Sequence, residues 1–401
     1  MTVQFSFDDG ATWPREHHVL LDERGGAYSS LVMLNDETVG ILYESSQANL
    51  LYQTVPVPTP PRKKRKPVKK KQQQAGSNSN AALSRIMFGS CIKQQNPVPI
   101  FKTIVEQKPD LFLFLGDNIY ADTNDRKVMQ RKYARLNSLA DFRRLRESMP
   151  VLATWDDHDY GRNDAGVEYP QKVESQQEFL RFWNEPKDSP LWRRPGIYTS
   201  QIFGPEGKRV QIILLDTRYF RSELKRGKKR VGGHWVPDQD PKKTMLGAAQ
   251  WEWLEAELRK PAELRIVVSS IQAVAQDAGQ ETWSNFPAER ARLFKLIDDT
   301  GANGVVFVSG DRHWSELSST GPETPYPLFD LTSSSLNQVH GRGTPTENRF
   351  RVSNTTYHKP NFGAVLIDWK PQPSVTLQII DESAEVRFEQ SIRLRDLTLR
   401  K

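Results

Sequence analysis

The sequence predicts an α/β protein built on a mixed, largely parallel sheet, preceded by a short all-β segment. Two observations lead to this fold class. Between residues 83 and 394, short apolar runs typical of buried strands alternate with amphipathic helical stretches, as in parallel sheets covered by helices. Before residue 55 the pattern is strand-like alternation only. We therefore divide the chain of 401 residues into a β segment at 1–54, a linker at 55–82 and a main domain at 83–401.

The first segment has the pattern of one β-propeller blade. Ser6–Trp13 matches the Asp-box S-x-D-x-G-x-T-W, a turn found in such blades, and strand-like alternation follows. The segment resembles the last blade of a sialidase, and this resemblance implies that Tyr28 is the nucleophile and Glu44 its neighbour. A propeller needs several blades, and one alone leaves its faces and edges uncovered. We interpret residues 1–54 as a truncated domain without sialidase activity.

The linker has the composition of a disordered segment. Val55–Pro61 is proline-rich and favours extended polyproline II, and Arg62–Lys71 holds eight basic residues and no acidic one. That run exceeds the formal net charge of +7, so the rest of the chain carries about −1. A nuclear-localisation or nucleic-acid role for the run is the alternative to a solvated spacer. Because the body of the protein is near neutral, we expect no stable nucleic-acid complex.

Several protein classes are disfavoured by the composition. No apolar stretch reaches the roughly 18–20 residues that span a bilayer, so no transmembrane segment is expected. Met1–Asp9 lacks the basic and apolar regions of a signal peptide, and the cellular location stays open. Cys91 is the only cysteine, which excludes an intrachain disulfide.

Four apolar runs in the main domain each end in residues that can bind a metal. An α/β sheet presents its active-site residues at the carboxyl ends of its strands, so these residues are expected at one edge. Four such runs in one domain favour a metal-dependent enzyme. The runs and the residues that follow them are Ile86–Gly89 with Cys91, Leu111–Leu115 with Asp117 and Tyr120, Val151–Trp155 with Asp156 and Asp157, and Gly304–Val308 with Asp311 and His313.

The other elements continue the alternation. Strands are predicted at Val210–Leu215 and Leu264–Ser270, and amphipathic helices at Gly247–Lys260 and Ala288–Asp299. The tail is more continuously β and is expected to pair antiparallel at a sheet edge. Its predicted strands are Ala364–Trp369, Val375–Ile380 and Val386–Leu394.

These residue types suit a pair of metal ions. Asp117 follows a glycine at a strand end and is a candidate bridging ligand. The phenolate of Tyr120 favours a hard, highly charged ion such as ferric iron, and Asp157 and Asn163 can give oxygen ligands to a second, harder ion. Paired metals suit phosphoryl transfer, because they stabilise the attacking and leaving oxygens together.

The motifs F-G-S-C, L-G-D-N-I-Y-A-D, W-D-D-H-D, L-L-D-T-R and S-G-D-R-H-W resemble those of the alkaline phosphatase D (PhoD-like) metallophosphoesterases over roughly residues 84–370. The resemblance implies an αββα sandwich of two mixed sheets and hydrolysis of phosphate monoesters and diesters. It also implies iron plus calcium, with zinc, manganese and magnesium as alternatives. The matching residues are Cys91, Asp117, Tyr120 and Asp311 for iron, and Asp117, Asp157, Asn163 and His313 for the second ion.

The same resemblance makes His158 the leaving-group acid or a phosphate contact. Arg218 either offers a fork to a phosphoryl oxygen or pairs with a structural acid. Asp156 is either a catalytic residue or a cap of the helix or turn that follows it. The division of roles among Asp156, Asp157 and Asn163 is left open.

The resulting hypothesis is a phosphoric ester hydrolase in which metal-bound hydroxide attacks phosphorus in line. The substrate is expected to be a phosphate ester such as a nucleotide or a phospholipid. The alternatives are a sialidase-type glycosidase fragment and a non-catalytic binding protein that keeps the fold.

Overall fold

The structure is a computed structural model that describes residues 2–6, 13–23, 26–35, 38–45, 50–58, 80–276, 279–321, 324–340 and 346–399. The chain separates into two compact units, residues 1–71 and residues 72–401. The boundary falls inside the predicted linker, of which residues 59–79 lie outside the described residues.

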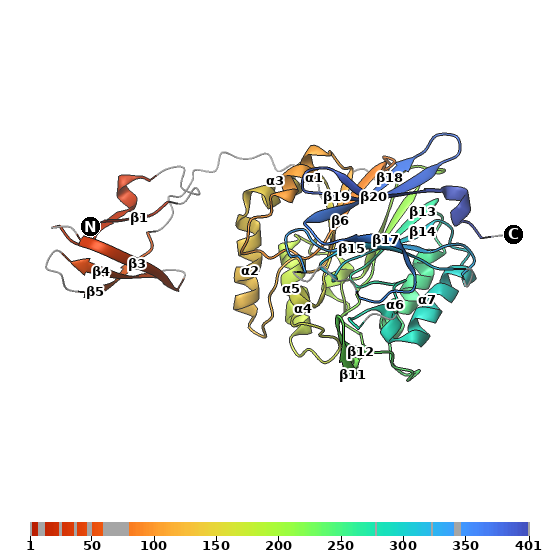
Figure 1. Ribbon diagram of the computed structural model, residues 1–401, viewed down its shortest axis with the longest axis horizontal. Helices are drawn as coiled ribbons and strands as arrows, with labels where there is room; N and C mark the ends of the chain where they lie inside the picture. Colours follow the sequence, from red (N-terminus) through yellow and green to blue (C-terminus); the bar gives the residue numbers. More distant parts are fainter. Residues whose placement is uncertain are drawn as a thin grey trace. The chain divides into compact units, whose positions relative to one another are not determined.

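The N-terminal unit is all β (Figure 1). Its strands are β1 (Thr2–Gln4), β2 (His18–Leu20), β3 (Gly26–Asn35), β4 (Thr38–Ser45) and β5 (Leu50–Pro56), with a 3-10 helix at Arg15–His17. Strands β1 and β2 pair antiparallel, and β3, β4 and β5 form an antiparallel sheet in that order. Four buried side chains make its small core, namely Val39, Ile41, Tyr43 and Val55.

The predicted start of the linker is wrong by two residues. Val55 is buried and lies opposite Val39, so strand β5 continues to Pro56 instead of becoming polyproline II. The apolar contact of Val55 with the small core decides this. Glu44 is half-buried in β4, whereas residues 7–12 of the Asp-box and the side chain of Tyr28 lie outside the described residues.

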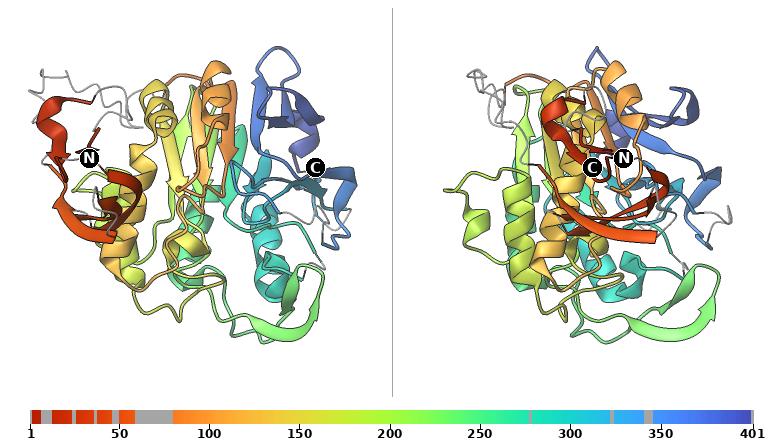
Figure 2. Two further views of the ribbon diagram at one scale, coloured as in Figure 1. Left: turned by 60° about the vertical axis from the view of Figure 1, so that its left-hand side comes forward. Right: turned by 90° about the vertical axis from the view of Figure 1, so that its left-hand side faces the viewer.

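The main unit contains two large sheets (Figure 2). The first has the order β20-β19-β18-β6-β7-β8 and the second has the order β17-β15-β16-β14-β13-β10-β9. Strands of the first sheet are β6 (Arg85–Gly89), β7 (Leu111–Leu115), β8 (Val151–Thr154), β18 (Asn361–Asp368), β19 (Ser374–Asp381) and β20 (Val386–Arg393). Strands of the second are β9 (Thr199–Phe203), β10 (Val210–Leu214), β13 (Leu264–Ser269), β14 (Val305–Ser309), β15 (Ser315–Ser319), β16 (Phe329–Ser333) and β17 (Arg351–Tyr357).

The second sheet has a parallel centre and antiparallel edges, whereas the first is parallel on the side that ends at β8 and antiparallel on the side that ends at β20. Strands β6, β7 and β8 run parallel, as do β10, β13, β14 and β16. The tail strands β18, β19 and β20 pair antiparallel, which confirms the sequence prediction for this edge. The strands predicted at 210–215 and 264–270 are β10 and β13, and both are buried throughout.

Alternate residues of β7 belong to different cores. Leu111, Leu113 and Leu115 pack in the large core together with residues of the second sheet, such as Ile213. Phe112 and Phe114, on the other face of β7, belong to a second core that also contains residues of the helices. This period of two is the expected pattern for a strand buried on both faces. The two sheets therefore pack face to face with helices outside, which confirms the αββα class.

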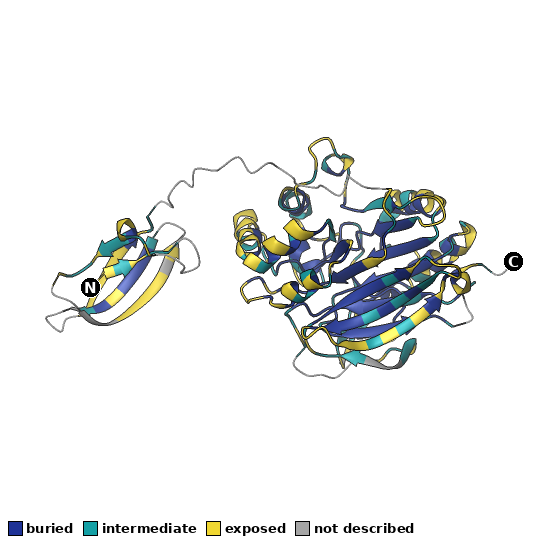
Figure 3. Cartoon of the chain, turned by 90° about the horizontal axis from the view of Figure 1, so that it is seen from above, coloured by how far each residue is buried: buried dark blue, intermediate teal, exposed yellow. Residues whose placement is uncertain are grey.

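The helices cover the outer faces, as Figure 3 shows by their exposed outer surfaces. Their bounds are α1 (Ile100–Glu106), α2 (Arg126–Ser138), α3 (Ala140–Ser148), α4 (Asp157–Tyr160), α5 (Lys172–Phe182), α6 (Gly247–Leu258) and α7 (Pro287–Asp299), with 3-10 helices at Pro190–Trp192, Trp283–Asn285 and Leu394–Leu397. Helices α1, α2 and α3 cover the first sheet through residues such as Phe101 and Phe142. Helices α6 and α7 are the two predicted ones, and Nε1 of Trp251 in α6 donates to Glu289 in α7 over 2.8 Å. Among the described residues, no helix combines the length and apolar character required to cross a bilayer.

A separate two-stranded hairpin, β11 (Lys225–Arg230) and β12 (Gly233–Val236), projects from the body of the main unit (Figure 1). It belongs to neither large sheet.

Candidate metal centre

The carboxyl ends of β6, β7, β8 and β14 bring the predicted ligands together. Cys91, Asp117, Asp311 and His313 all have positive φ angles, of 63°, 51°, 68° and 59°. Such angles are uncommon for residues other than glycine. They persist only where the surrounding structure enforces them, and they cluster at functional sites. Gly116 has a φ of 106°, and a Cβ there would lie 2.5 Å from Cβ of Asp156. Only glycine fits this turn.

One group of ligands surrounds the carboxylate of Asp117. Its Oδ2 lies 3.4 Å from the thiol sulfur of Cys91 and 3.4 Å from the hydroxyl of Tyr120. The Tyr120 hydroxyl lies 2.9 Å from Nε2 of His313. Ligand atoms of Cys91, Asp117 and His313 are all within 4.8 Å of one another. A cysteine sulfur, a phenol oxygen, a carboxylate and an imidazole nitrogen thus converge on one point.

Burial makes the charged forms of these groups costly in the absence of a cation. Burial raises the pKa of the Cys91 thiol to about 11. The pKa of Tyr120 and that of Asp117 are also raised by burial, and next by the neighbouring Cys91. A metal ion between these donors would offset that cost and hold them deprotonated. The chemistry of this donor set therefore fits a bound cation.

A second group of ligands is purely acidic. Asp156, Asp157 and Asp311 place carboxylate oxygens within 4.8 Å of one another. Asp156 is buried, and its Oδ2 has no hydrogen-bond partner among the described residues. A buried carboxylate oxygen without a partner is costly unless a cation or water meets it. Asp311 lies in this acidic group, whereas the sequence assigned it to the Cys91 group.

Asp117 also links the two groups. Ligand atoms of Asp117, Asp157 and His158 lie within 4.8 Å of one another, so Asp117 contacts both sets. The pKa of Asp157 is raised by burial, but the charges of His158 and Arg218 outweigh this and the net effect lowers it.

Asn163 and Asp164 differ in their positions. Asn163 is exposed, and its Nδ2 donates to Oδ2 of Asp164 over 2.8 Å. Asp164 is half-buried and has ligand oxygens within 4.8 Å of those of Asp157 and Glu281. The backbone N–H of Asp164 donates to Oδ2 of Asp157 over 2.6 Å. Burial, followed by the charge of Glu281, raises the pKa of Asp164 to about 7.

His158 is held between a ring and a carboxylate. Its Nδ1 lies 2.7 Å from Oδ1 of Asp122, and its ring centroid is 4.2 Å from that of Tyr120. Burial lowers the pKa of His158, but Asp157 and Asp117 outweigh it and the net pKa rises to about 11. The imidazolium is therefore the stable form beside these carboxylates.

Arg218 is buried, and its guanidinium group is not exposed to solvent. Its Nε lies 2.6 Å from Oδ1 of Asp156, and its Nη1 lies 2.6 Å from Oε2 of Glu281. Glu281 in turn pairs with Arg221, whose Nε is 2.8 Å from Oε1. The guanidinium of Arg218 is thus occupied by two carboxylates. This differs from the predicted phosphoryl contact and matches the geometry of the alternative, a pairing with acids.

Three residues of the site were not among those predicted from the sequence. Asp122 lies two residues after Tyr120, and Asp159 accepts hydrogen bonds from the backbone N–H groups of Asp156, Asp117 and Asn118. Both belong to the quoted motifs and could have been found there. Glu281 lies in a loop without a recognisable pattern, and only the fold brings it to the site.

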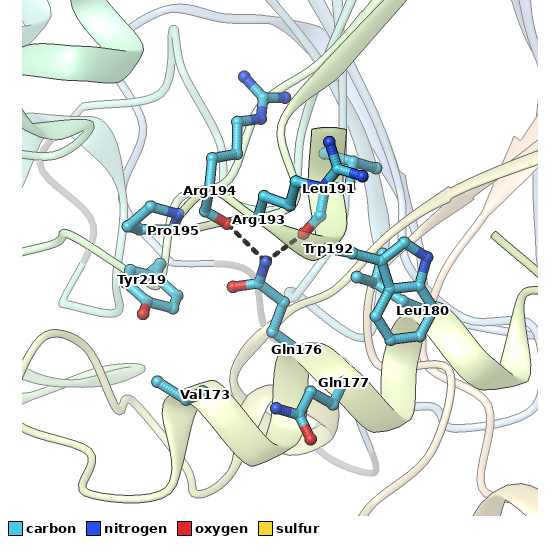
Figure 4. A pocket seen from close by; sticks show the side chains of 10 residues that line it. All are labelled: Val173, Gln176, Gln177, Leu180, Leu191, Trp192, Arg193, Arg194, Pro195 and Tyr219. Carbon is cyan, nitrogen blue, oxygen red and sulfur yellow. Dashed lines mark hydrogen bonds between the residues drawn. The ribbon is translucent and has the colours of Figure 1, made fainter. Parts of the chain in front are cut away.

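A pocket elsewhere in the main unit lies between α5 and the segment 190–195 (Figure 4). It has a volume of about 200 Å³. Nε2 of Gln176 donates to the carbonyl oxygens of Leu191 and Arg194 over 2.7 and 2.8 Å. Its walls contain none of the predicted metal ligands.

Comparison with known proteins identifies the family of the main unit. A sequence model of PhoD-like phosphatases matches residues 86–373. The chain belongs to the PhoD-like phosphatase family. The match runs from strand β6 to the turn before β19 and includes every predicted metal ligand and catalytic residue of the main domain.

Individual relatives match different parts of the chain. Alkaline phosphatase D of Bacillus subtilis (strain 168) is 24% identical over 299 residues, which is 64% of this chain and 50% of that protein. The chain thus spans half the length of this curated relative. A solved structure of PhoD has a TM-score of 0.61 at 17% identity, covering 88% of this chain and 77% of that one, and shares its fold. A sialidase of Bacteroides fragilis (strain YCH46) is 51% identical over 55 residues, which is 14% of this chain and 10% of the sialidase.

Proposed function

We propose that this PhoD-like protein is a metal-dependent hydrolase of phosphate esters, acting on monoesters and diesters. One observation carries the proposal. Overlapping sets of cysteine, aspartate and histidine donors, each set within 4.8 Å, meet where the strands of both sheets end. Buried acids gathered in this way need cations, and paired cations suit phosphoryl transfer.

The first ion would be held by Cys91, Asp117, Tyr120 and His313. Asp311 would lie between this ion and the acidic group to which it belongs. Asp117 is the shared ligand, because it lies within reach of both groups. The second ion would be held by Asp157 together with Asp156 or Asp164. By resemblance the ions are iron and calcium, and zinc, manganese or magnesium are alternatives. The metal pair supplies a nucleophile from water and offsets the negative charge of the phosphoryl group.

His158 is proposed to protonate the leaving-group oxygen. Its protonated state is favoured by Asp157 and Asp117, and its 2.7 Å contact with Asp122 fixes the orientation of the ring. Nδ1 is engaged with Asp122, which leaves Nε2 to face a substrate. Asp122 would therefore be a positioning residue for His158.

Asp156 and Arg218 are proposed to act as a pair. Arg218 holds one oxygen of Asp156 through Nε, while Oδ2 of Asp156 stays without a partner in the described part of the chain. That oxygen is the one available for a metal ion or for a water molecule beside it. Arg218 would then position Asp156 and partly neutralise the negative charge of the acidic group.

The proposal is tested by hydrolysis of p-nitrophenyl phosphate and bis-p-nitrophenyl phosphate after loading with iron and calcium. We expect p-nitrophenol release from at least one of the two esters, loss of activity with chelator and recovery when metal is returned. The matched control is Asp368→Asn, which should behave like wild type. Asp368 is exposed at the end of β18, and because β18 runs antiparallel to β6, it lies beside the start of β6 and away from the carboxyl end of that strand. Metal-loaded protein that is inactive on both esters would count against the proposal.

A further inference from the structure

The hairpin of β11 and β12 carries a dense positive charge that the proposed chemistry does not use. Strand β11 has the sequence KRGKKR. We call residues 225–236 the basic hairpin, after its exposed side chains Lys225, Arg226, Lys228 and Lys229. Outside the linker run the chain is near neutral, so this is a local concentration of charge. None of these four side chains has a hydrogen bond or ion pair with another described residue.

The basic hairpin is joined to the candidate metal centre by Trp235. The indole Nε1 of Trp235 donates to Oδ2 of Asp164 over 3.0 Å. Asp164 itself has ligand oxygens within 4.8 Å of those of Asp157 and Glu281. The backbone N–H of Trp235 also donates to the carbonyl of Gly279 over 3.0 Å, in the loop that carries Glu281. One face of the hairpin is thereby fixed beside the acidic group.

Arg226 is on the same face as that indole. Arg226 and Trp235 are direct partners in the antiparallel pairing of β11 with β12, and directly opposed side chains project from the same face. Arg226 is exposed, so its guanidinium stays available to a ligand next to the site. An arginine fork is suited to phosphate oxygens.

We infer that the basic hairpin binds a second phosphate group of the substrate, and that the enzyme prefers phosphate esters carrying such a group. This inference rests on the proposed function. The metal pair would bind the phosphoryl group that reacts. The basic hairpin is linked to the metal centre through Trp235 and has basic but no acidic side chains, so it would bind an anion. Arg226 is the residue expected to contribute most, with Lys228 as its neighbour.

A membrane surface is a less suitable partner for the same charges. Surfaces that insert into lipid combine basic residues with several large apolar side chains. In the described part of the hairpin, Val231 is the single exposed large apolar residue. A phosphate group on the reacting molecule therefore fits the surface better than a bilayer.

The test uses two substrates that differ by one phosphate: thymidine 5′-(4-nitrophenyl phosphate) and its 3′-phosphorylated form. We expect wild type to have a kcat/KM about fivefold higher for the phosphorylated substrate, the size of effect that exposed charge contacts give. Arg226→Gln/Lys228→Gln should bring this ratio close to one and leave kcat/KM for the first substrate nearly unchanged. About 0.5 M salt should have the same effect on wild type, because it screens exposed charges.

The control is Lys260→Gln/Lys370→Gln, which removes the same charge. Lys260 follows α6 and Lys370 follows β18, both at the strand edges opposite the site. This control should keep the wild-type ratio. An equal ratio in wild type and in the hairpin variant would overturn the inference. So would a hairpin variant that loses only its binding to phosphatidylglycerol vesicles.

Failure of the proposed function is distinguishable from failure of this inference. If neither thymidine ester is hydrolysed by metal-loaded protein, phosphoesterase activity is in doubt. Calorimetric binding of thymidine 3′,5′-bisphosphate then still tests the hairpin, with weaker binding expected for the hairpin variant than for wild type and the control. Equal binding by all three proteins would contradict the inference.

Discussion

Nε of Arg218 lies 2.6 Å from Oδ1 of Asp156, and both side chains are buried. Their pairing places a permanent positive charge in contact with the acidic group of the candidate metal centre. It also connects that group to Glu281 in a loop far away in the sequence.

Removing the charge of Arg218 should destabilise the fold. Arg218→Met leaves Asp156 buried without its cation and leaves Glu281 with Arg221 alone, and breaking a buried pair in this way costs about 3–5 kcal/mol. Guanidinium denaturation of the metal-free protein measures the free energy of unfolding. Arg259→Met is the control, since Arg259 pairs with Glu255 at the surface and should lose less than about 1 kcal/mol. Equal losses in the two variants would contradict the role of Arg218.

Asp164 should matter more than Asn163 for metal content. Asp164 lies among the acidic ligands, whereas Asn163 is exposed and only contacts Asp164. We expect Asp164→Asn to lower the occupancy of the second metal several-fold and Asn163→Ala to keep it near the wild-type value. Elemental analysis of equally loaded samples measures this. The opposite order would restore Asn163 as the ligand.

His158→Asn should lower kcat in a manner that depends on the leaving group. Phenolate is a poorer leaving group than p-nitrophenolate and gains more from protonation, so its ester should lose about 10²–10⁴-fold, and the p-nitrophenyl ester less. Asp122→Asn should produce a smaller loss with the same dependence. Asn tolerates the φ of 45° at position 122, so that variant tests the carboxylate and not the turn. Equal losses on both esters would remove His158 as the acid.

Acid should weaken a structural contact between strands β19 and β20. Asp381 accepts hydrogen bonds from the N–H groups of Ser383 and Glu385 and from Arg387. Burial raises the pKa of Asp381, but the Arg387 contact outweighs this and the net pKa lies below the usual 3.8. Its stabilisation is therefore complete above pH 3.8 and is lost as pH falls through the lower folded pKa.

Asp381→Asn should accordingly melt at a lower temperature than wild type near pH 7, with a loss of about 1–3 kcal/mol. The difference should shrink below pH 3.8. Thermal melts at several pH values measure it. A difference that grows on acidification would contradict this sign.

The sequence allowed the fold class and most of the side chains that the structure brings together to be predicted, because their signals are local. Strand β7 is a run of five apolar residues that ends at Gly116-Asp117, and the glycine is required by the close approach of Asp156. The tail strands show apolar alternation, and they form the predicted edge of the first sheet.

Other features depend on contacts that no local pattern contains. Glu281 reaches the site only because its loop follows β13, and Arg218 is buried because two distant acids meet it. Helices α2 and α3 were not predicted because they are rich in charged residues and bury few side chains, namely Met129, Tyr133 and Leu136 in α2 and Phe142 and Leu145 in α3. Which of Asn163 and Asp164 lies among the acidic side chains depends on the backbone direction after α4, where Asp164 has a φ of 56°.

The most direct test of a two-metal phosphoesterase is the metal stoichiometry of one preparation, measured by plasma mass spectrometry alongside its hydrolysis of bis-p-nitrophenyl phosphate. Wild type and Asp117→Asn should be compared, with Asp368→Asn as the control. The account predicts two or more ions per chain and activity in wild type and control, with both reduced together in Asp117→Asn. Folded wild-type protein that binds no metal under any loading condition would contradict it.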